Sequence, residues 1–416
     1  MSRWARRLGL AVCAALLAVA GAQAQEKLEI FSWWNGDQGS ALQALINQFN
    51  ALYPDVAVTN AAAAVGPGVD AKAVLRTRML TGDPPDSFQV RGGQDLIGTW
   101  VISERMQSLS GFYRTQGWMA AFPKDLIELL STRSGIWSIP VDVFRCNVLW
   151  YVPARLKEWG VNPPRTWGEL MNACQKLKDA GVEGPLAVGA PQTLVDLWES
   201  VAVATLGPDA WSALWTGKLK LNDPRAVRVW DNFGKALDFS NSDAAGLSWQ
   251  QAMDRVVKGD SAFMIQGDWA ESYLAHTLSL NPGNDFAWVP SPGTSGVFVA
   301  RVDSFGLPAG IRDVASTFKW LRMLGTKEAQ DVFNPLNGSI SPRFDSDVSR
   351  YSAYSQSAAR DWRTSRIIGS LAHGMAAPGW FSSQFADVMS IYLASRDSRA
   401  AASAAQAIAD QARLGK

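Results

Sequence analysis

Metal-ligating and disulfide-forming side chains are scarce in this sequence. Its 416 residues include two histidines and three cysteines, and no spacing of histidine, cysteine and acidic residues indicates a metal site. Beyond residue 24 the cysteines are Cys146 and Cys174. An oxidising compartment would permit a disulfide between them, but one pair is no disulfide framework. We therefore expect stability to come from apolar burial, and we expect neither a metal nor another cofactor.

An excess of charge of one sign is missing as well. The whole chain has a formal net charge of +1. Residues 1–24 hold three arginines and no acids, so the remainder is slightly negative. A basic surface of the kind that attracts nucleic acid is therefore not expected.

Apolar runs long enough to span a membrane are also absent. The longest, residues 8–20, is shorter than the roughly 20 residues that a membrane-spanning helix needs. Arginines at positions 3, 6 and 7 precede this run, and Ala22-Gln23-Ala24 follows it. This is the pattern of a secretory signal peptide. We expect cleavage after Ala24 and a soluble mature protein in the periplasm.

What remains is a chain of alternating strand and helix patterns. Residues 28–31 read as a strand, and the apolar positions between 42 and 49 have the spacing of a helix. A strand near 56–58, a helix over 70–80 and a strand over 87–90 continue the alternation. This order predicts an α/β fold whose open, mostly parallel sheet binds ligands at the carboxyl ends of its strands.

A second group of elements begins near residues 136–140 and includes a strand over 148–151. Thr166 and Glu169 have capping-box spacing and predict a helix start, as does Asp223 before Pro224. The alanine-rich residues 400–412 predict a C-terminal helix. About 390 mature residues exceed the size of one ordinary hydrophobic core, so we expect two lobes.

Tryptophan is unusually abundant, with 19 residues. Most should be buried in the cores, because that is where large aromatic side chains usually lie. Indole faces also suit the apolar faces of sugar rings, so we expect four or five of them to face a ligand.

Several segments recur together in one group of known proteins. They are Phe31-Ser32-Trp33-Trp34, Gly135–Pro140, Lys157–Trp167, Gly267-Asp268-Trp269-Ala270, Asp303-Ser304-Phe305-Gly306 and Asp361-Trp362-Arg363. With them, the chain resembles periplasmic glucose/mannose-binding proteins, which belong to the extracellular solute-binding proteins of ABC sugar importers.

The resemblance implies a two-lobe periplasmic binding protein fold with an interlobe ligand cleft and hinge crossovers. The expected division is a signal peptide over 1–24, a first lobe over 25–136 plus 291–340, and a second lobe over 137–290 plus 341–416. We expect the hinge near 137–140 and 290–294. The implied function is capture of a glucose- or mannose-like sugar by a monomer and its delivery to membrane permease subunits.

The resemblance also implies a set of ligand contacts. Trp249 could instead pack on the sheet, and His373 could be a structural histidine. Asp303 is the strongest polar candidate, because a carboxylate can accept two hydroxyl hydrogen bonds in a dry cleft. The candidate substrate-binding residues are Trp33, Trp34, Gln38, Arg91, Trp249, Trp269, Asp303, Asn337 and His373.

Some of these positions depart from the resembled family. Gln38, Arg91 and Asn337 stand where the family typically has Glu, His and Lys. Asp142 and Phe144 replace an Asn and a His on the opposite wall. Arg91 either pairs with Asp142 or binds an acidic ligand through its planar fork, so an acidic or larger saccharide is an alternative ligand.

Parts of the sequence are compatible with two other functions. Asp268 and Glu271 could suggest a glycoside hydrolase, but they lie at a predicted helix start, where acids complement the helix dipole. No Gly-x-Ser-x-Gly elbow or phosphate-binding glycine loop is present, so we do not expect an enzyme. A ligand sensor no longer coupled to transport would have the same sequence features, and this alternative stays open.

Overall fold

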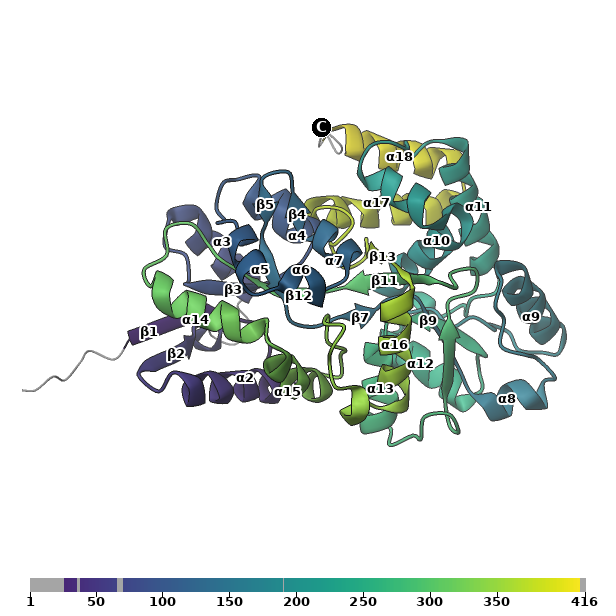
Figure 1. Cartoon of the computed structure of the whole chain (residues 1–416). Helices are drawn as coiled ribbons and strands as arrows, with labels where there is room; N and C mark the ends of the chain where they lie inside the picture. The colour runs from purple at the N-terminus through teal and green to yellow at the C-terminus, as the bar shows by residue number, and fades with distance from the viewer. Residues whose placement is uncertain (1–25, 36–37, 66–69, 190, 412–416) are drawn as a thin grey trace, which may run out of the picture.

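A computed structural model describes residues 26–35, 38–65, 70–189 and 191–411. The predicted signal peptide over 1–24, with its cleavage site after Ala24, lies outside these residues. The chain forms two lobes, each with its own sheet and helices (Figure 1). The predicted two-lobe α/β fold is therefore confirmed.

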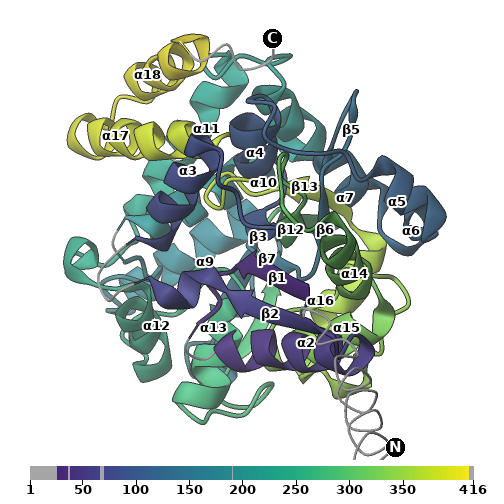
Figure 2. The same cartoon turned by 90° about the vertical axis from the view of Figure 1, so that its left-hand side faces the viewer.

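The first lobe is built on a five-stranded sheet in the order β2-β1-β3-β12-β6. Strand β1 pairs in parallel with β2 and β3, whereas β12 is antiparallel to β3 and β6. Figure 2 views this lobe from its outer side. The strands are β1 (Glu26–Phe31), β2 (Val56–Asn60), β3 (Ser87–Arg91), β6 (Ser138–Pro140) and β12 (Asp303–Gly306).

Both faces of this sheet are covered, as expected for parallel strands. Successive residues of β1 point to opposite faces, so Ile30 enters one apolar cluster and Phe31 another. Helices α2 (Gly39–Leu52), α14 (Val314–Leu324) and α15 (Lys327–Asn337) contribute to the first cluster. The second cluster includes side chains of α3 (Ala71–Thr81) and α4 (Gln94–Leu96). Short elements complete the lobe: α5 (Ser110–Thr115), α6 (Trp118–Ala121), α7 (Lys124–Leu129), β4 (Ser131–Thr132) and β5 (Gly135–Ile136).

The second lobe contains two three-stranded sheets. One has the order β10-β8-β9, with β8 (Val148–Tyr151), β9 (Phe263–Gln266) and β10 (Ala287–Pro290). The other has the order β13-β11-β7, with β7 (Phe144–Arg145), β11 (Val297–Arg301) and β13 (Arg366–Gly369). The helices are α8 (Pro153–Glu158), α9 (Trp167–Asp179), α10 (Gln192–Trp215), α11 (Pro224–Leu237), α12 (Trp249–Lys258), α13 (Trp269–Ser272), α16 (Ala353–Thr364), α17 (Gly379–Ser395) and α18 (Ser398–Gln411).

Capping signals placed several helix starts correctly. Thr166 and Glu169 form a reciprocal capping box at the start of α9. Asp223 accepts a hydrogen bond from the Arg225 backbone at the start of α11, with Pro224 in the first turn. The alanine-rich segment forms α18, with Ala401, Ala402 and Ala405 buried. The local sequence thus determines these ends.

The chain crosses between the lobes three times. The first crossing, 141–143, joins β6 to β7; the second, Val302, joins β11 to β12; the third is the segment between α15 and α16. Backbone hydrogen bonds hold the three together, from Val141 N to Asp303 O (2.9 Å) and between Val143 and Ile340 (2.8 and 3.1 Å). Sequence patterns do not reveal such close lateral pairing, because the partners lie far apart in the chain.

These pairings move the expected lobe boundaries. The predicted division placed 137–140 in the second lobe, but β6 hydrogen-bonds to β12 of the first sheet. It also placed 291–302 in the first lobe, but β11 pairs with β7 and β13 of the second lobe. The first two crossings, 141–143 and Val302, therefore lie C-terminal to the predicted hinge segments 137–140 and 290–294.

The second lobe has its own apolar cluster, which is rich in aromatic side chains. Trp198 and Trp230 pack at a centroid distance of 5.3 Å, and Tyr392 packs on Trp230 at 4.9 Å. Cys146 and Cys174 are buried in this cluster as free thiols, so the disulfide that the sequence permits is not formed. Burial raises the pKa of Cys174 to about 12, which keeps this thiol protonated.

Candidate functional site

Two cavities lie beside the crossings. The larger, with a volume of about 900 Å³, lies at the carboxyl end of β3, and we call it the β3 cavity. The smaller, about 380 Å³, lies beside α13, and we call it the α13 cavity. Side chains lining the β3 cavity include Trp33, Lys72, Arg91, Asp95, Trp100 and Trp380. Those lining the α13 cavity include Gln38, Phe144, Trp249, Trp269, Arg301 and Asn337.

Trp269 is placed by the turn between β9 and α13. Gly267 lies under its indole, where an added Cβ would come within 2.2 Å of the ring. Two polar groups also lie beside the indole: the His373 ring lies edge-on with centroids 4.8 Å apart, and the Arg301 guanidinium lies 5.9 Å from the indole centroid. The indole is thus fixed by a glycine and flanked by hydrogen-bonding groups.

Trp249 and the side-chain amides of Gln38 and Asn337 form another part of the α13 cavity. Trp249 is the first residue of α12, whose start is fixed by a capping box of Ser248 and Gln251. Its ring meets Tyr273 edge-on, with centroids 5.4 Å apart. Gln38 donates to Asn337 Oδ1 at 3.1 Å. These two amides, predicted as separate contacts, therefore form one unit.

Asp303 lies at the start of β12 and is fully buried. Its Oδ2 accepts a hydrogen bond from Arg301 Nη2 at 2.9 Å, while its Oδ1 is buried without a partner among the described residues. In the sheet it lies opposite Arg91. Burial alone would lower the pKa of Arg301, but Asp303 and Asp142 raise it. The positive charge of Arg301 is thus balanced by carboxylates of the protein itself.

Asp142 has a structural role instead of pairing with Arg91. Its Oδ1 accepts from the Asp303 backbone at 2.8 Å, and its Oδ2 accepts from Asn337 Nδ2 at 3.0 Å. Burial and the nearby Asp303 raise the pKa of Asp142 well above its usual range. The predicted alternative of an Arg91–Asp142 ion pair is therefore wrong, because Asp142 is turned toward the crossings.

Arg91 is the last residue of β3 and lines the β3 cavity. Its Nη1 donates to the His373 carbonyl at 3.4 Å, and its Nε is buried without a partner in the described part of the chain. Burial and the nearby Arg301 lower the pKa of Arg91, against the opposing effect of Asp303. Lys72 Nζ lies 4.8 Å from the Trp33 ring centroid on another wall of this cavity.

His373 connects the two cavities, since its ring contacts Trp269 and its carbonyl accepts from Arg91. Burial, reinforced by Arg91 and Arg301, lowers the pKa of His373 well below its usual range, so the imidazole is neutral. Its Nε2 lies 3.4 Å from Asp196 Oδ1. A neutral imidazole presents one donor and one acceptor nitrogen.

A buried carboxylate holds the segment that carries His373. Glu199, on α10, accepts hydrogen bonds from Ser370 Oγ (2.9 and 3.0 Å) and from the backbone of Leu371 and Ala372. Burial raises the pKa of Glu199 to about 8 and that of Asp196 to about 7.

Sequence reasoning missed both these acids, together with Arg301 and Lys72. The signal for the first two was present: Asp196 and Glu199 are the acids of the mostly apolar stretch 194–203, where a carboxylate needs a specific partner. For Arg301 and Lys72 the sequence held no comparable signal.

Eight of the nine predicted ligand contacts lie in one region around the two cavities, and Trp34 is the exception. Trp33 and Arg91 line the β3 cavity; Gln38, Trp249, Trp269 and Asn337 line the α13 cavity; Asp303 and His373 contact residues of both. Trp34 packs in the first-lobe core against Phe305 and Phe333, with centroids 5.7 and 4.5 Å apart. Trp33 and Trp34 are thus neighbours in the chain whose side chains enter different environments, a cavity and the core.

The acids considered for hydrolysis lie outside both described cavities. Asp268 is buried, and its Oδ2 accepts from the Arg145 backbone at 2.8 Å. Burial raises the pKa of Asp268 to about 7. Glu271 is buried one turn further along α13. Both acids are therefore buried structural residues of the second lobe.

A model of the bacterial extracellular solute-binding protein family matches residues 33–331. The chain belongs to this family. It is 33% identical over 389 residues to an uncharacterized ABC transporter extracellular-binding protein of Pyrococcus horikoshii, covering 91% of this chain and 86% of the relative. It is 26% identical to a probable sugar-binding periplasmic protein of Brucella suis, covering 92% of each.

Solved structures agree with the fold of this family. A bacterial solute receptor described as having an exclusive preference for β-D-galactopyranose superposes with a TM-score of 0.77 at 15% identity, covering 94% of this chain and 100% of the receptor. A chitin oligosaccharide-binding protein superposes with a TM-score of 0.75 at 16% identity, covering 94% and 99%. Among the described residues no helix combines the length and apolar character needed to cross a membrane.

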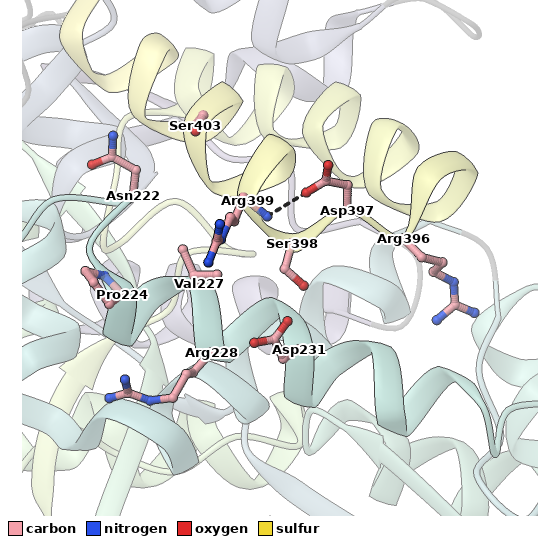
Figure 3. A pocket seen from close by; sticks show the side chains of 10 residues that line it. All are labelled: Asn222, Pro224, Val227, Arg228, Asp231, Arg396, Asp397, Ser398, Arg399 and Ser403. Atoms are coloured by element: carbon pink, nitrogen blue, oxygen red, sulfur yellow. Dashed lines mark hydrogen bonds between the residues drawn. The ribbon is translucent and has the colours of Figure 1, made fainter.

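A third hollow of about 810 Å³ lies away from the crossings, between α11 and the start of α18 (Figure 3). Arg228 and Asp231 line it from α11, and Asp397 caps α18 by accepting from the backbone of Arg399 and Ala400 at 2.9 Å each. None of the nine predicted contacts lines it, so it provides surface positions for control substitutions.

Proposed function

We propose that this solute-binding protein captures a sugar in the cleft beside the crossings and delivers it to the permease subunits of an ABC importer. The expected ligand is a glucose- or mannose-like monosaccharide or a related saccharide. The mature protein acts as a monomer in the periplasm.

One observation carries this proposal. Asp303 Oδ1, Arg91 Nε and His373 Nε2 are buried polar atoms without a hydrogen-bond partner in the part of the chain that the structure describes. They lie beside tryptophans of two cavities. Unsatisfied buried polar atoms are costly in a folded protein, so they favour a ligand that supplies both donors and acceptors.

A sugar ring has the chemistry that these groups require. Its hydroxyls can donate to Asp303 Oδ1 and accept from Arg91 Nε, while its apolar faces can stack on indole rings such as Trp269. A hydrogen bond to a charged group contributes roughly 1.5 to 3 kcal/mol. Two or three of them fix the orientation of a bound ring, so the polar atoms would select the sugar and the indoles would add affinity.

The names of relatives support the same proposal. The Brucella suis relative is a probable sugar-binding periplasmic protein. A xylose/arabinose-binding protein of Haloferax volcanii is 25% identical and covers 84% of this chain and 77% of the relative. The Pyrococcus horikoshii relative is assigned to an ABC transporter. Two of these names describe sugar binding and one an ABC transporter, which supports the proposed ligand class and partner.

The test is a thermal-shift screen of monosaccharides, followed by calorimetric titration. A sugar at a hundredfold excess over its Kd stabilises the native state by about 2.7 kcal/mol. Asp303→Asn should weaken binding roughly ten- to a hundredfold, because one charged hydrogen bond is lost. Asp231→Asn, at the third hollow, is the matched control and should bind like the wild type. No response to any saccharide would refute the proposal.

A further inference from the structure

We infer that the β3 cavity receives an anionic substituent of the bound sugar and that Arg91 and Lys72 are the residues that bind it. This inference rests on the proposed function and specifies its ligand as an acidic sugar. The observations behind it are the charges of the cavity, the free edge of Arg91 and the absence, among the described residues, of an ion pair to Arg91 or Lys72.

The charges of this cavity differ from those of the rest of the cleft. Three cationic side chains line it, Lys72, Arg76 and Arg91, against two acids, Asp70 and Asp95. Asp70 is already engaged, because its carboxylate accepts from the Lys72 backbone and caps α3. The cavity therefore has cationic groups in excess of the carboxylates that could neutralise them.

Arg91 has a free edge that suits an anion. Its Nη1 is occupied by the His373 carbonyl, which fixes the guanidinium plane. Its Nε is buried and unpartnered, and Nη2 makes no hydrogen bond to a described residue. The Nε and Nη2 protons of an arginine point in parallel, and this fork fits two oxygens of a carboxylate or phosphate.

Arg91 is also distinguished from the other buried arginines of this region. Arg301 pairs with Asp303, and Arg145 pairs with Asp361. In the part of the chain that the structure describes, neither Arg91 nor Lys72 forms an ion pair. Asp303 and Asp95 lie near enough to favour the charged form of Arg91, but neither forms an ion pair with it. A desolvated guanidinium without a paired carboxylate is costly, so a ligand anion would offset the part of this cost that remains.

Asp95 is the competing carboxylate and must be considered. It lines the same cavity and its backbone donates to the Gly374 carbonyl at 2.8 Å, but its side chain forms no ion pair with Arg91 or Lys72. Burial is the main cause that raises the pKa of Asp95. The nearby Arg91 and Lys72 act against this effect, so Asp95 reduces the positive charge of the cavity, and with Asp70 engaged at the start of α3 a single carboxylate is left against three cations.

The inference is tested by calorimetric titration of the full mature chain with matched pairs of sugars. Glucuronate is compared with glucose, and galacturonate with galactose. Glucose 6-phosphate tests whether the anion is a phosphate. We expect the acid of one pair to bind roughly ten- to a hundredfold more tightly than its neutral partner. Added salt should reduce this preference.

Variants then locate the anion. Arg91→Gln should reduce the preference for the acid at least tenfold, and Lys72→Gln should reduce it less, because Lys72 is exposed. Arg228→Gln, at the third hollow, should leave the preference unchanged. If Arg91→Gln fails to fold, the exposed Lys72→Gln variant and the salt dependence still test the inference.

The outcomes separate this inference from the proposed function. Neutral sugars that bind as tightly as every acid, or an acid preference unchanged in both cavity variants, would overturn the inference and leave sugar binding intact. A tighter complex with glucose 6-phosphate than with either uronate would identify the anion as a phosphate. If no sugar of either class binds, the proposed function itself fails.

Discussion

The indole of Trp269 lies against a glycine and beside two polar side chains. It rests on Gly267 and approaches His373 and Arg301. Replacing Trp269 by alanine should weaken sugar binding at least tenfold, because a stacking surface is lost. The fold should persist, since the indole is partly exposed in the α13 cavity. Calorimetry and thermal melting measure the two effects; unfolding of the variant would show that the indole serves the core instead.

Gly267→Ala tests the position of the indole without deleting it. A Cβ at residue 267 would lie 2.2 Å from the ring, so the indole must move. We expect weaker sugar binding, with all ligand-facing side chains still present. Gly111→Ala is the matched control, because nothing lies within 4 Å of a Cβ built there. Equal sugar affinities in the two variants would contradict this account of Trp269.

At the level of single residues, sequence reasoning selected side chains that the structure brings together around two cavities, but it did not predict how they pair. Trp33, Trp249 and Trp269 all line cavities, whereas Trp34 is a core residue. Two adjacent tryptophans after a strand face opposite sides, and the sequence does not say which faces the cleft. The partner of Asp142 was also not predictable, because Asn337 lies 195 positions away in the chain.

Helix α10 contributes two buried acids that support the His373 segment, and they make stability depend on pH. The pKa of Glu199 is about 8 in the folded state, raised by burial from an ordinary value of 4.5. Between these values the folded state holds a proton that the unfolded state releases, so the free energy of unfolding falls as pH rises. Asp196, with a pKa raised to about 7, adds in the same direction.

Glu199→Gln should therefore flatten the pH dependence. Near pH 5 the variant should be within about 1 kcal/mol of the wild type, because an amide resembles a protonated carboxyl group. Towards pH 8 the wild type should lose more stability than the variant, whose remaining loss comes from Asp196. Denaturant melts across this range measure both, with the exposed Glu183→Gln as control. Parallel curves for wild type and Glu199→Gln would contradict the assignment.

Helices and strands differ in how far the sequence predicts them. The starts of α9 and α11 follow from capping residues a few positions away. Strands β6, β7, β11 and β12 are two to five residues long, and their partners come from distant segments. Short strands hold little periodicity, which is why the predicted lobe boundaries were displaced while the two-lobe fold was correct.

For the whole molecule, we expect sugar binding to draw the two lobes together. A sugar that contacts both lobes at once binds the closed form more tightly than the open form. This difference in affinity is what closure requires. Small-angle scattering should show a smaller radius of gyration at saturating sugar. The Asp303→Asn variant at the same sugar concentration is the control and should stay extended. An unchanged radius in the wild type at saturation would count against closure.

The three crossings constrain that motion further. They lie side by side, joined by backbone hydrogen bonds between Val141 and Asp303 and between Val143 and Ile340. Twisting one lobe against the other would shear these bonds, whereas rotation about a line across the three strands would preserve them. We therefore expect one soft rotation between the lobes, whose equilibrium would set the fraction of molecules competent to bind. Because apparent affinity scales with that fraction, substitutions at the crossings can tune affinity for every ligand by a common factor without touching the cavities.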